Sequence, residues 1–297
     1  MAEHLVQATR ATPTHHAPPW LRRLPRLGAR LFTHLVLAAG SALLSFPFAW
    51  MLSTSLKLSV ETFDYPPKLI PSVLVWENYT AAITYGFLLR GALNSSIIVS
   101  FNILGEFFVA SMVAYSFARL RWPGRDICFV LMLSTMMLPG AVTMVPLFIL
   151  FKQLGWVNTF LPLIVPAFGG SPFYIFLLRQ FFTTIPRDLE DAARIDGASI
   201  PQIWAQIMMP LIAPALAAVC IFTFRATWND FMGPLIYIDS PSLRPMSLAL
   251  FSFRQEHGTD WNTLMAASTL MTLPVVLVFF FFQRYFIQGI TLTGIKG

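Results

Sequence analysis

The sequence predicts an all-α membrane protein with six transmembrane helices and a charged cytoplasmic loop between spans 4 and 5. The first observation is composition: of 297 residues, 56% are hydrophobic and only 11% are charged. Soluble domains carry about 25% charged residues, so the chain lies far outside that class. The other two observations are that apolar residues gather into long runs, and that one charged block separates two of these runs.

Six apolar runs reach the length of about 20 residues that a helix needs to cross a hydrocarbon core. They cover roughly 31–52, 94–118, 126–150, 160–182, 211–234 and 263–283. Prolines interrupt the third and fourth runs, and proline is tolerated in a membrane helix where neighbouring groups satisfy the freed carbonyls. These two runs therefore predict kinked helices. We divide the chain into a basic, Pro-rich tail, 1–30, and a transmembrane domain, 31–297.

The run at 31–52 could be either a secretory signal or a first span. A signal peptide has a short apolar stretch followed by small residues at a cleavage site. This run is as long as a span and leads into "FAWMLSTSLK", which begins with large residues. We therefore expect an uncleaved first span.

Basic residues predict the orientation of the spans. If the tail is cytoplasmic, the cytoplasmic side holds more Lys and Arg than the outer side, as the positive-inside rule requires. The cytoplasmic set is Arg10, Arg22, Arg23, Arg26, Arg30, Arg119, Arg121, Arg125, Arg179, Arg187, Arg194, Arg284 and Lys296, and the outer set is Lys57, Lys68, Arg90, Lys152, Arg244 and Arg254. Both termini are thus predicted to be cytoplasmic. The basic pI reflects this topology in a lipid bilayer, with no nucleic-acid partner.

Motifs for catalysis or cofactor binding are missing from the sequence. It contains no G-x-x-x-x-G-K-[ST] phosphate loop, no H-E-x-x-H, no paired C-x-x-C and no G-x-S-x-G. We therefore predict that the chain is not an enzyme and holds neither a metal nor a cofactor. If it takes part in ATP-driven transport, ATP and Mg²⁺ must bind to partner subunits.

The charged block is "IPRDLEDAARIDGASIPQIWAQIMMP", residues 185–210. Pro186 and the acids that follow it suit the first turn of a helix. Gly197 suits a helix end, because glycine adopts the left-handed conformation readily. Ser199 can cap a second helix with Pro201 in its first turn. The block predicts a helix, a glycine break and another helix. Taken alone, two interfacial helices lying on the membrane would fit as well.

The spacing of this block resembles the signature loop of ABC-importer membrane subunits. That pattern is E-A-A, three residues, G, nine residues, I, one residue, L-P. Asp191-Ala192-Ala193 corresponds to E-A-A and Met209-Pro210 to L-P, so aspartate and methionine depart from the pattern. The resemblance implies that the block docks on an ATP-binding subunit. The candidate coupling residues are Glu190, Asp191, Ala192, Ala193, Asp196, Gly197, Ala198, Ser199, Ile207 and Pro210.

Other segments extend the resemblance over about residues 40–297. They are "FARLRWPGRD" (117–126), "LLRQFFTTIPRDLEDAARIDGAS" (177–199), "WND" (228–230), "DWNTLMAAS" (260–268) and "QRYFIQGITLTGIKG" (283–297). Together they resemble carbohydrate-type importer permeases, in particular the shorter maltose-importer permease. The resemblance implies a subunit of a prokaryotic inner membrane importer that forms half of a carbohydrate path. Its implied partners are a homologous second permease, two ATP-binding cassette subunits and an extracytoplasmic substrate-binding protein.

Polar side chains within the spans are candidates for the substrate path. They are Asn94, Asn102, Glu106, Tyr174, Arg225, Trp228 and Asn229. Polar residues in membrane helices also serve helix packing, which is the alternative for each. Charges in a membrane indicate function by default, although Glu106 and Arg225 could neutralise each other. If Arg225 lined the path unpaired, the cargo could be anionic, such as a uronate oligosaccharide or a glycerophosphate ester.

An ion-coupled secondary transporter is the less favoured alternative. Such carriers usually have more spans, internal repeats and rows of ionisable residues. The sequence shows no convincing repeat, and in such a carrier the charged block would have no partner.

Overall fold

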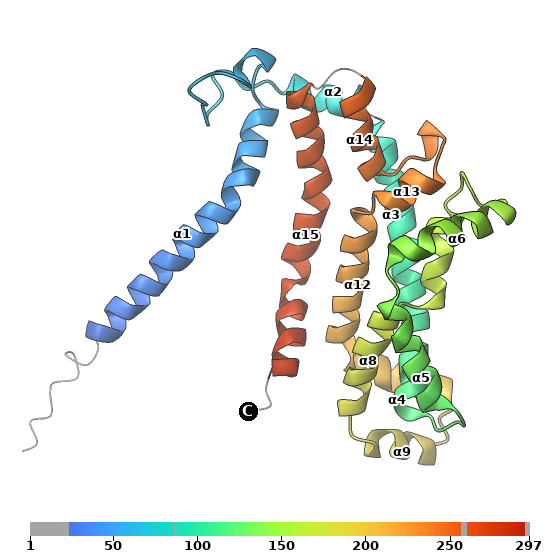
Figure 1. Cartoon of the computed structure of the whole chain (residues 1–297). Coiled ribbons are helices and arrows are strands. Elements are labelled where there is room, and N and C mark those ends of the chain that lie inside the picture. The colour runs from blue at the N-terminus through green and yellow to red at the C-terminus, as the bar shows by residue number, and fades with distance from the viewer. Residues whose placement is uncertain (1–23, 86, 257–259, 295–297) are drawn as a thin grey trace, which may run out of the picture. The chain divides into compact units, whose positions relative to one another are not determined.

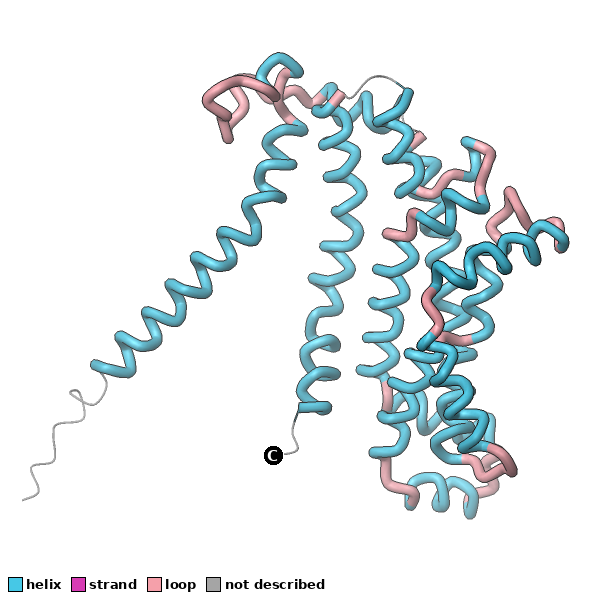
Figure 2. The backbone as a smooth tube through the Cα atoms, in the orientation of Figure 1, coloured by secondary structure: helices cyan, strands magenta, loops and turns pink. Residues whose placement is uncertain are grey.

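The computed structural model describes residues 24–85, 87–256 and 260–294, and the regular structure of this part of the chain is helical (Figures 1 and 2). The chain divides into two compact units, Met1–Trp50 and Met51–Gly297, which are described separately. The all-α prediction is confirmed. Residues 1–23 of the predicted tail lie outside the described residues, so the predicted division of the chain at residue 30 stays a prediction.

The described part of the first unit consists of helix α1 (Leu24–Ser55), which continues a few residues into the second unit. Its stretch Arg30–Ser55 has a mean hydropathy of 1.9 and is long enough to cross a membrane. The predicted first span, 31–52, falls inside this stretch. No charged side chain follows Arg30 within α1, which is what a hydrocarbon environment requires.

The second unit is a set of helices and short helical turns. Its α-helices are α2 (Glu77–Tyr85), α3 (Leu88–Gly105), α4 (Ser111–Arg119), α5 (Arg125–Ser134), α6 (Gly140–Gln153), α7 (Leu161–Ile164), α8 (Pro172–Thr184), α9 (Asp188–Ile195), α10 (Ile200–Gln202), α11 (Met209–Leu211), α12 (Ala213–Trp228), α13 (Met232–Tyr237), α14 (Met246–Glu256) and α15 (Trp261–Gly294). Two π-helical segments, Glu106–Ala110 and Ile203–Met208, connect α3 to α4 and α10 to α11. Short 3₁₀ turns occupy Ser59–Glu61, Thr135–Met137, Val165–Gly169 and Pro241–Leu243.

Among the described residues, four helical stretches are apolar and long enough to cross a membrane, or up to six if each of two bent pairs counts as one span. The chain is therefore a multi-pass membrane protein. The single stretches of the second unit are Leu88–Arg119, Leu161–Thr184 and Trp261–Gln283. They contain the predicted spans 94–118, 160–182 and 263–283, apart from residue 160.

The predicted third span, 126–150, is not one helix. The structure has Arg125–Met137 and Gly140–Gln153, bent by 100°. Between them, Leu138 is extended, with φ −79° and ψ 118°, because the ring of Pro139 disfavours helical backbone in the residue before it. The proline that predicted a kink therefore divides this segment.

The predicted fifth span, 211–234, also differs from the structure. Its helix α12 ends at Trp228, and the residues that follow form the separate helix α13. At its start, Ile200–Leu211 and Ala213–Trp228 meet at 82°. Pro214 has no N–H to donate to the carbonyl of Pro210, so the helix cannot continue regularly there. The helix of this segment begins after Ile212 rather than at the predicted residue 211.

Two packing groups organise the second unit. In one, α4 packs along α8, and the buried residues between them include Ala114, Leu178 and Phe182. The Tyr115 and Phe182 rings meet edge to face, with centroids 5.6 Å apart. In the other group, α12 packs against α3 and α15. The charged block leaves this packed body at the α8 end and forms α9 (Figure 1).

Gly105 allows α3 to approach the 3₁₀ turn Val165–Gly169 closely. A Cβ atom at residue 105 would lie 3.0 Å from the carbonyl carbon and oxygen of Ala167. We expect Gly105→Leu to lower the thermal unfolding midpoint in detergent, because overpacking costs about 1–3 kcal/mol. Gly140→Leu is the matched control, since a Cβ atom there meets nothing within 4 Å. Equal midpoints for the two variants would contradict this account of the packing.

Candidate functional site

The charged block folds as two helical segments separated by Gly197. Helix α9 spans Asp188–Ile195, and its first turn carries the acids Asp188, Glu190 and Asp191. Gly197 has φ 82°, and its N–H donates to the carbonyl of Arg194 at 3.1 Å. The next segment begins after Ser199, whose N–H donates to the Gln202 side chain at 2.8 Å. The left-handed glycine thus ends α9 and redirects the chain.

Helix α9 has one buried face and one exposed face. Glu190 and Ala193, three residues apart, are both buried. Leu189 and Ile195 are exposed, and Ile195 keeps 87% of its surface accessible. Leu189 and Ile195 lie about 120° apart around the helix, so Ile195 alone is the exposed apolar side chain opposite the buried face.

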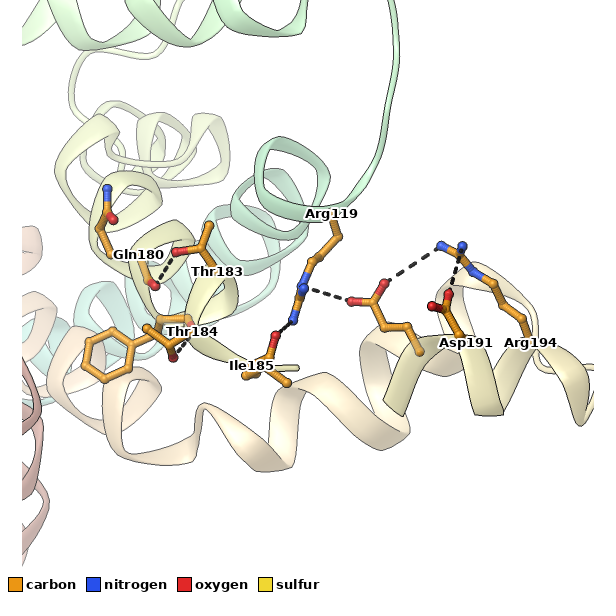
Figure 3. Close-up of polar contacts among 9 residues, drawn as sticks. Arg119, Gln180, Thr183, Thr184, Ile185, Asp191 and Arg194 are labelled. Atoms are coloured by element: carbon orange, nitrogen blue, oxygen red, sulfur yellow. Dashed lines mark hydrogen bonds and ion pairs between the residues drawn. The ribbon is translucent and has the colours of Figure 1, made fainter. Parts of the chain in front are cut away.

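Glu190 is held by a buried ion pair. Its Oε1 lies 3.0 Å from Nε of Arg119, the last residue of α4, and the two side chains are only 5% and 3% exposed (Figure 3). The same arginine donates through Nη2 to the carbonyl oxygen of Ile185 at 2.5 Å. Arg194 lies 3.8 Å from both Glu190 and Asp191, in a more open position. Arg119 thus joins the ends of α4 and α8 to α9.

Of the predicted coupling set, Glu190 and Ala193 are buried, and the other members are half-buried or exposed. Ala198 and Ile207 are half-buried, whereas the exposed members are Asp191, Ala192, Asp196, Gly197, Ser199 and Pro210. The sequence-based set left out Arg119, which lies at the end of an apolar run within "FARLRWPGRD". A basic residue at the end of a span is also expected from topology alone, so its sequence position did not single it out.

Several candidate path residues make hydrogen bonds within the fold. The amide of Asn94 donates to the carbonyls of Ser242 and Arg244, both at 3.0 Å. The indole of Trp228 donates to the carbonyl of Met271 at 3.0 Å, and Trp228 is buried. Asn229, which is exposed, donates to a carbonyl of its own helix. Tyr174 on α8 is half-buried and packs against the core around Phe182.

Asn102 faces a polar cavity of about 300 Å³. The lining residues are Ser95, Ile98, Asn102, Leu163, Ala226, Thr227, Asp230, Pro234 and Pro245. The Asn102 amide donates to the Thr227 hydroxyl at 3.1 Å, and its buried carbonyl oxygen has no hydrogen-bond partner among the described residues. Thr227 was missing from the predicted residues. Such a cavity offers hydrogen-bonding groups of the kind that hold a hydroxyl-rich ligand.

A larger cavity, of about 650 Å³, is lined almost wholly by apolar side chains. Its residues are Ile103, Phe107, Ala205, Met209, Pro210, Ala213, Leu216, Ala217, Cys220, Ile221, Phe224, Val278 and Phe282. It offers few partners for sugar hydroxyls, so the smaller polar cavity is the better candidate for the path.

Glu106 and Arg225 do not neutralise each other. Both carboxyl oxygens of the buried Glu106 accept the backbone N–H of Ser171, at 2.9 and 3.1 Å. Arg225 is exposed, lies outside the lining of the polar cavity, and has no carboxylate in ion-pairing distance among the described residues.

Comparisons with known proteins agree with the helical membrane fold and identify the family. Residues 106–292 match the family model described as the binding-protein-dependent transport system inner membrane component. The chain is 36% identical over 281 residues to the arabinooligosaccharides transport system permease protein AraQ of Bacillus subtilis, covering 93% of this chain and 100% of that protein. It is 33% identical to the trehalose/maltose transport system permease protein MalG of Thermococcus litoralis, covering 85% and 91% of the two chains.

A solved structure shares the fold. The structure is of a bacterial ABC transporter involved in the import of the acidic polysaccharide alginate. One of its chains matches with a TM-score of 0.76 at 20% sequence identity, covering 89% of this chain and 98% of that one. These relatives are transport subunits rather than enzymes. The chain therefore belongs to the family of binding-protein-dependent transport system inner membrane components, as an ABC importer permease of the carbohydrate type.

Proposed function

We propose that this chain is the permease subunit of an ATP-driven importer of neutral oligosaccharides or related polyols. In this proposal it forms half of a translocation path with a homologous second permease. Two ATP-binding cassette subunits bind ATP and Mg²⁺, and an extracytoplasmic binding protein delivers the substrate. The observation that carries the proposal is that α9 exposes Ile195 on one side, while a buried ion pair attaches its opposite side to the spans.

Docking on an ATPase explains both faces of α9. The exposed Ile195 would enter a cleft of the partner, and Asp191, one turn earlier on the same side, would fix the register through charge. The opposite face stays on this chain, because Glu190 is buried against Arg119. A helix loosely attached to its own spans could not transmit a push from the partner, so the buried attachment supports a coupling role.

The proposed topology counts each bent pair as one span. This gives six spans, with α9 and both termini on the cytoplasmic side of a prokaryotic inner membrane. The excess of arginine near α9, at residues such as Arg121, Arg125 and Arg187, supports this orientation. The polar cavity around Asn102 and Asp230 would then lie along the membrane-embedded path.

The names of the relatives support a neutral sugar cargo. AraQ and MalG are named for arabinooligosaccharides and for trehalose and maltose. The anionic-cargo alternative required Arg225 to line the path, and Arg225 is not among the residues that line the polar cavity. The alginate importer shares the fold at 20% identity and carries no argument about cargo.

Co-purification and transport test the proposal. A tagged form of this chain, expressed with its companion subunits, is expected to bring down a second permease and two ATPases. In proteoliposomes with the binding protein, oligosaccharide uptake should need internal ATP and stop with vanadate. Uptake by this chain alone, driven by an ion gradient and indifferent to vanadate, would falsify the importer proposal.

A further inference from the structure

Charged side chains of one neighbouring span hold both ends of α8. At its N-terminus, Glu106 accepts the backbone N–H of Ser171, the residue that caps α8. At its C-terminus, Arg119 donates to the carbonyl oxygen of Ile185, the residue at the other cap. Glu106 and Arg119 are both buried, so neither contact is an incidental surface pair.

The signs and the spacing of the two contacts match α8. A negative group at a helix N-terminus and a positive group at its C-terminus both complement the helix dipole. At a helical rise of 1.5 Å per residue, the distance along the span from residue 106 to residue 119 is about 20 Å. The distance along α8 from residue 171 to residue 185 is about 21 Å. The two contacts therefore hold α8 in one register against the span Leu88–Arg119.

The surface between the two contacts is tightly packed. Ala114, Leu178 and Phe182 have no accessible surface, and Tyr115 meets the Phe182 ring edge to face. Packed cores shift between discrete arrangements rather than deforming smoothly. A helix fixed at both ends over such an interface moves together with its neighbour.

Arg119 extends this unit to α9. Its guanidinium donates a hydrogen bond to the C-terminal carbonyl of α8 and forms an ion pair, at 3.0 Å, with the carboxylate of Glu190 (Figure 3). Neutralising one member of a buried ion pair leaves the other charge uncompensated, which is strongly unfavourable. The pair therefore resists any movement of α9 that α4 and α8 do not follow.

We propose that Glu106, Arg119 and Glu190 are positioning residues that make α4, α8 and α9 one rigid body. A displacement of α9 by the ATPase would thereby reach Ser171, about 20 Å along α8. The turn that precedes α8 ends at Gly170, whose backbone is left-handed with φ 75°. The inference rests on the proposed function and assigns Glu106 to transmission rather than to substrate contact.

The first test measures substrate imported per ATP hydrolysed by the complete importer in proteoliposomes. Arg119→Gln and Glu190→Gln are each expected to lower this ratio about tenfold, while ATP hydrolysis continues. The double variant should lose less than the product of the two single losses, because no buried charge is then left unpaired. Arg125→Gln is the control: it removes an arginine whose ion pair is with the exposed Asp126 rather than with α9, and the ratio should stay unchanged.

The second test measures transmission to the far end of α8. With Cys128 and Cys220 replaced by alanine, Ser171→Cys should react with a maleimide at different rates before and after vanadate trapping. Adding Arg119→Gln should remove that difference. A difference that persists, or an unchanged transport ratio in assembled Arg119→Gln, would overturn the proposal.

If the Arg119 variant fails to assemble, Glu106→Gln tests the rigid body instead. This variant alters the opposite end of α8 and leaves the ion pair of Arg119 with Glu190 intact. A tenfold lower ratio supports the rigid body, and a wild-type ratio or a failure to assemble overturns it. ATP dependence of uptake by the wild-type importer distinguishes a failure of the proposed function from a failure of the rigid-body inference. If its uptake is independent of ATP, the proposed function fails whatever the variants do.

Discussion

Gly197→Pro is expected to abolish ATP-driven import while leaving the chain inserted in the membrane. Proline requires φ near −65°, whereas this residue has φ 82°. The substitution also removes the N–H that donates to the carbonyl of Arg194 at 3.1 Å. The two losses together cost about 3 kcal/mol or more, enough to reshape the end of α9. Vanadate-sensitive uptake in proteoliposomes measures the effect, and the amount of inserted protein is the internal reference.

Gly197→Asn separates the backbone requirement from the loss of glycine itself. Asparagine adopts the left-handed conformation more readily than most residues, and a Cβ atom here meets nothing within 4 Å. We expect near-normal import from this variant. Asp191→Glu should also be nearly silent because it keeps the charge on the exposed rim. Wild-type, vanadate-sensitive uptake by the Gly197→Pro importer would show that this segment does not couple the ATPase to transport.

Ile195→Asp is expected to release the ATPase from the permease without unfolding it. The side chain is 87% exposed, so this chain alone loses little packing. In the complex, a buried carboxylate would replace an apolar anchor, and central anchors of this kind are worth roughly 2 kcal/mol or more. That corresponds to about 30-fold weaker binding of the ATPase, measured by pull-down across a range of ATPase concentrations.

Ile195→Leu provides the matched control, since it keeps an apolar side chain of similar size. The Ile195→Leu chain should bind the ATPase normally. Without the ATPase, both variants should have the same thermal unfolding midpoint as the parent chain. If Ile195→Asp binds the ATPase as tightly as the parent chain, the exposed face of α9 is not the docking surface.

The charged block shows which structural features can be predicted from neighbouring residues alone. Pro186, three acids and Gly197 predict a helix with a left-handed end, and the structure has that helix at Asp188–Ile195. These signals are local: a proline ring, a dipole and a glycine backbone act within one turn. The role of the block in coupling stays a prediction.

The broken spans show where local signals stop being sufficient. Pro139 predicted a kink, but a bend of 100° depends on how the two halves pack after the break. At the fifth segment, the prediction was one span over 211–234, whereas the helix is interrupted before Pro214 and ends at Trp228. Hydropathy reports only that a run is apolar, so it cannot distinguish one continuous helix from two that meet at an angle.

The sequence by itself determined the class of the protein, its apolar runs and the signature loop, because these depend on composition and on spacing along the chain. Only the tertiary structure decided the partners of its charged residues. Glu106 binds Ser171 rather than Arg225, and Arg119 binds Glu190. Each of these contacts joins residues more than sixty positions apart, and their proximity follows from the register of α4 against α8. That register is set by side-chain packing across the whole interface, which no single stretch of sequence encodes.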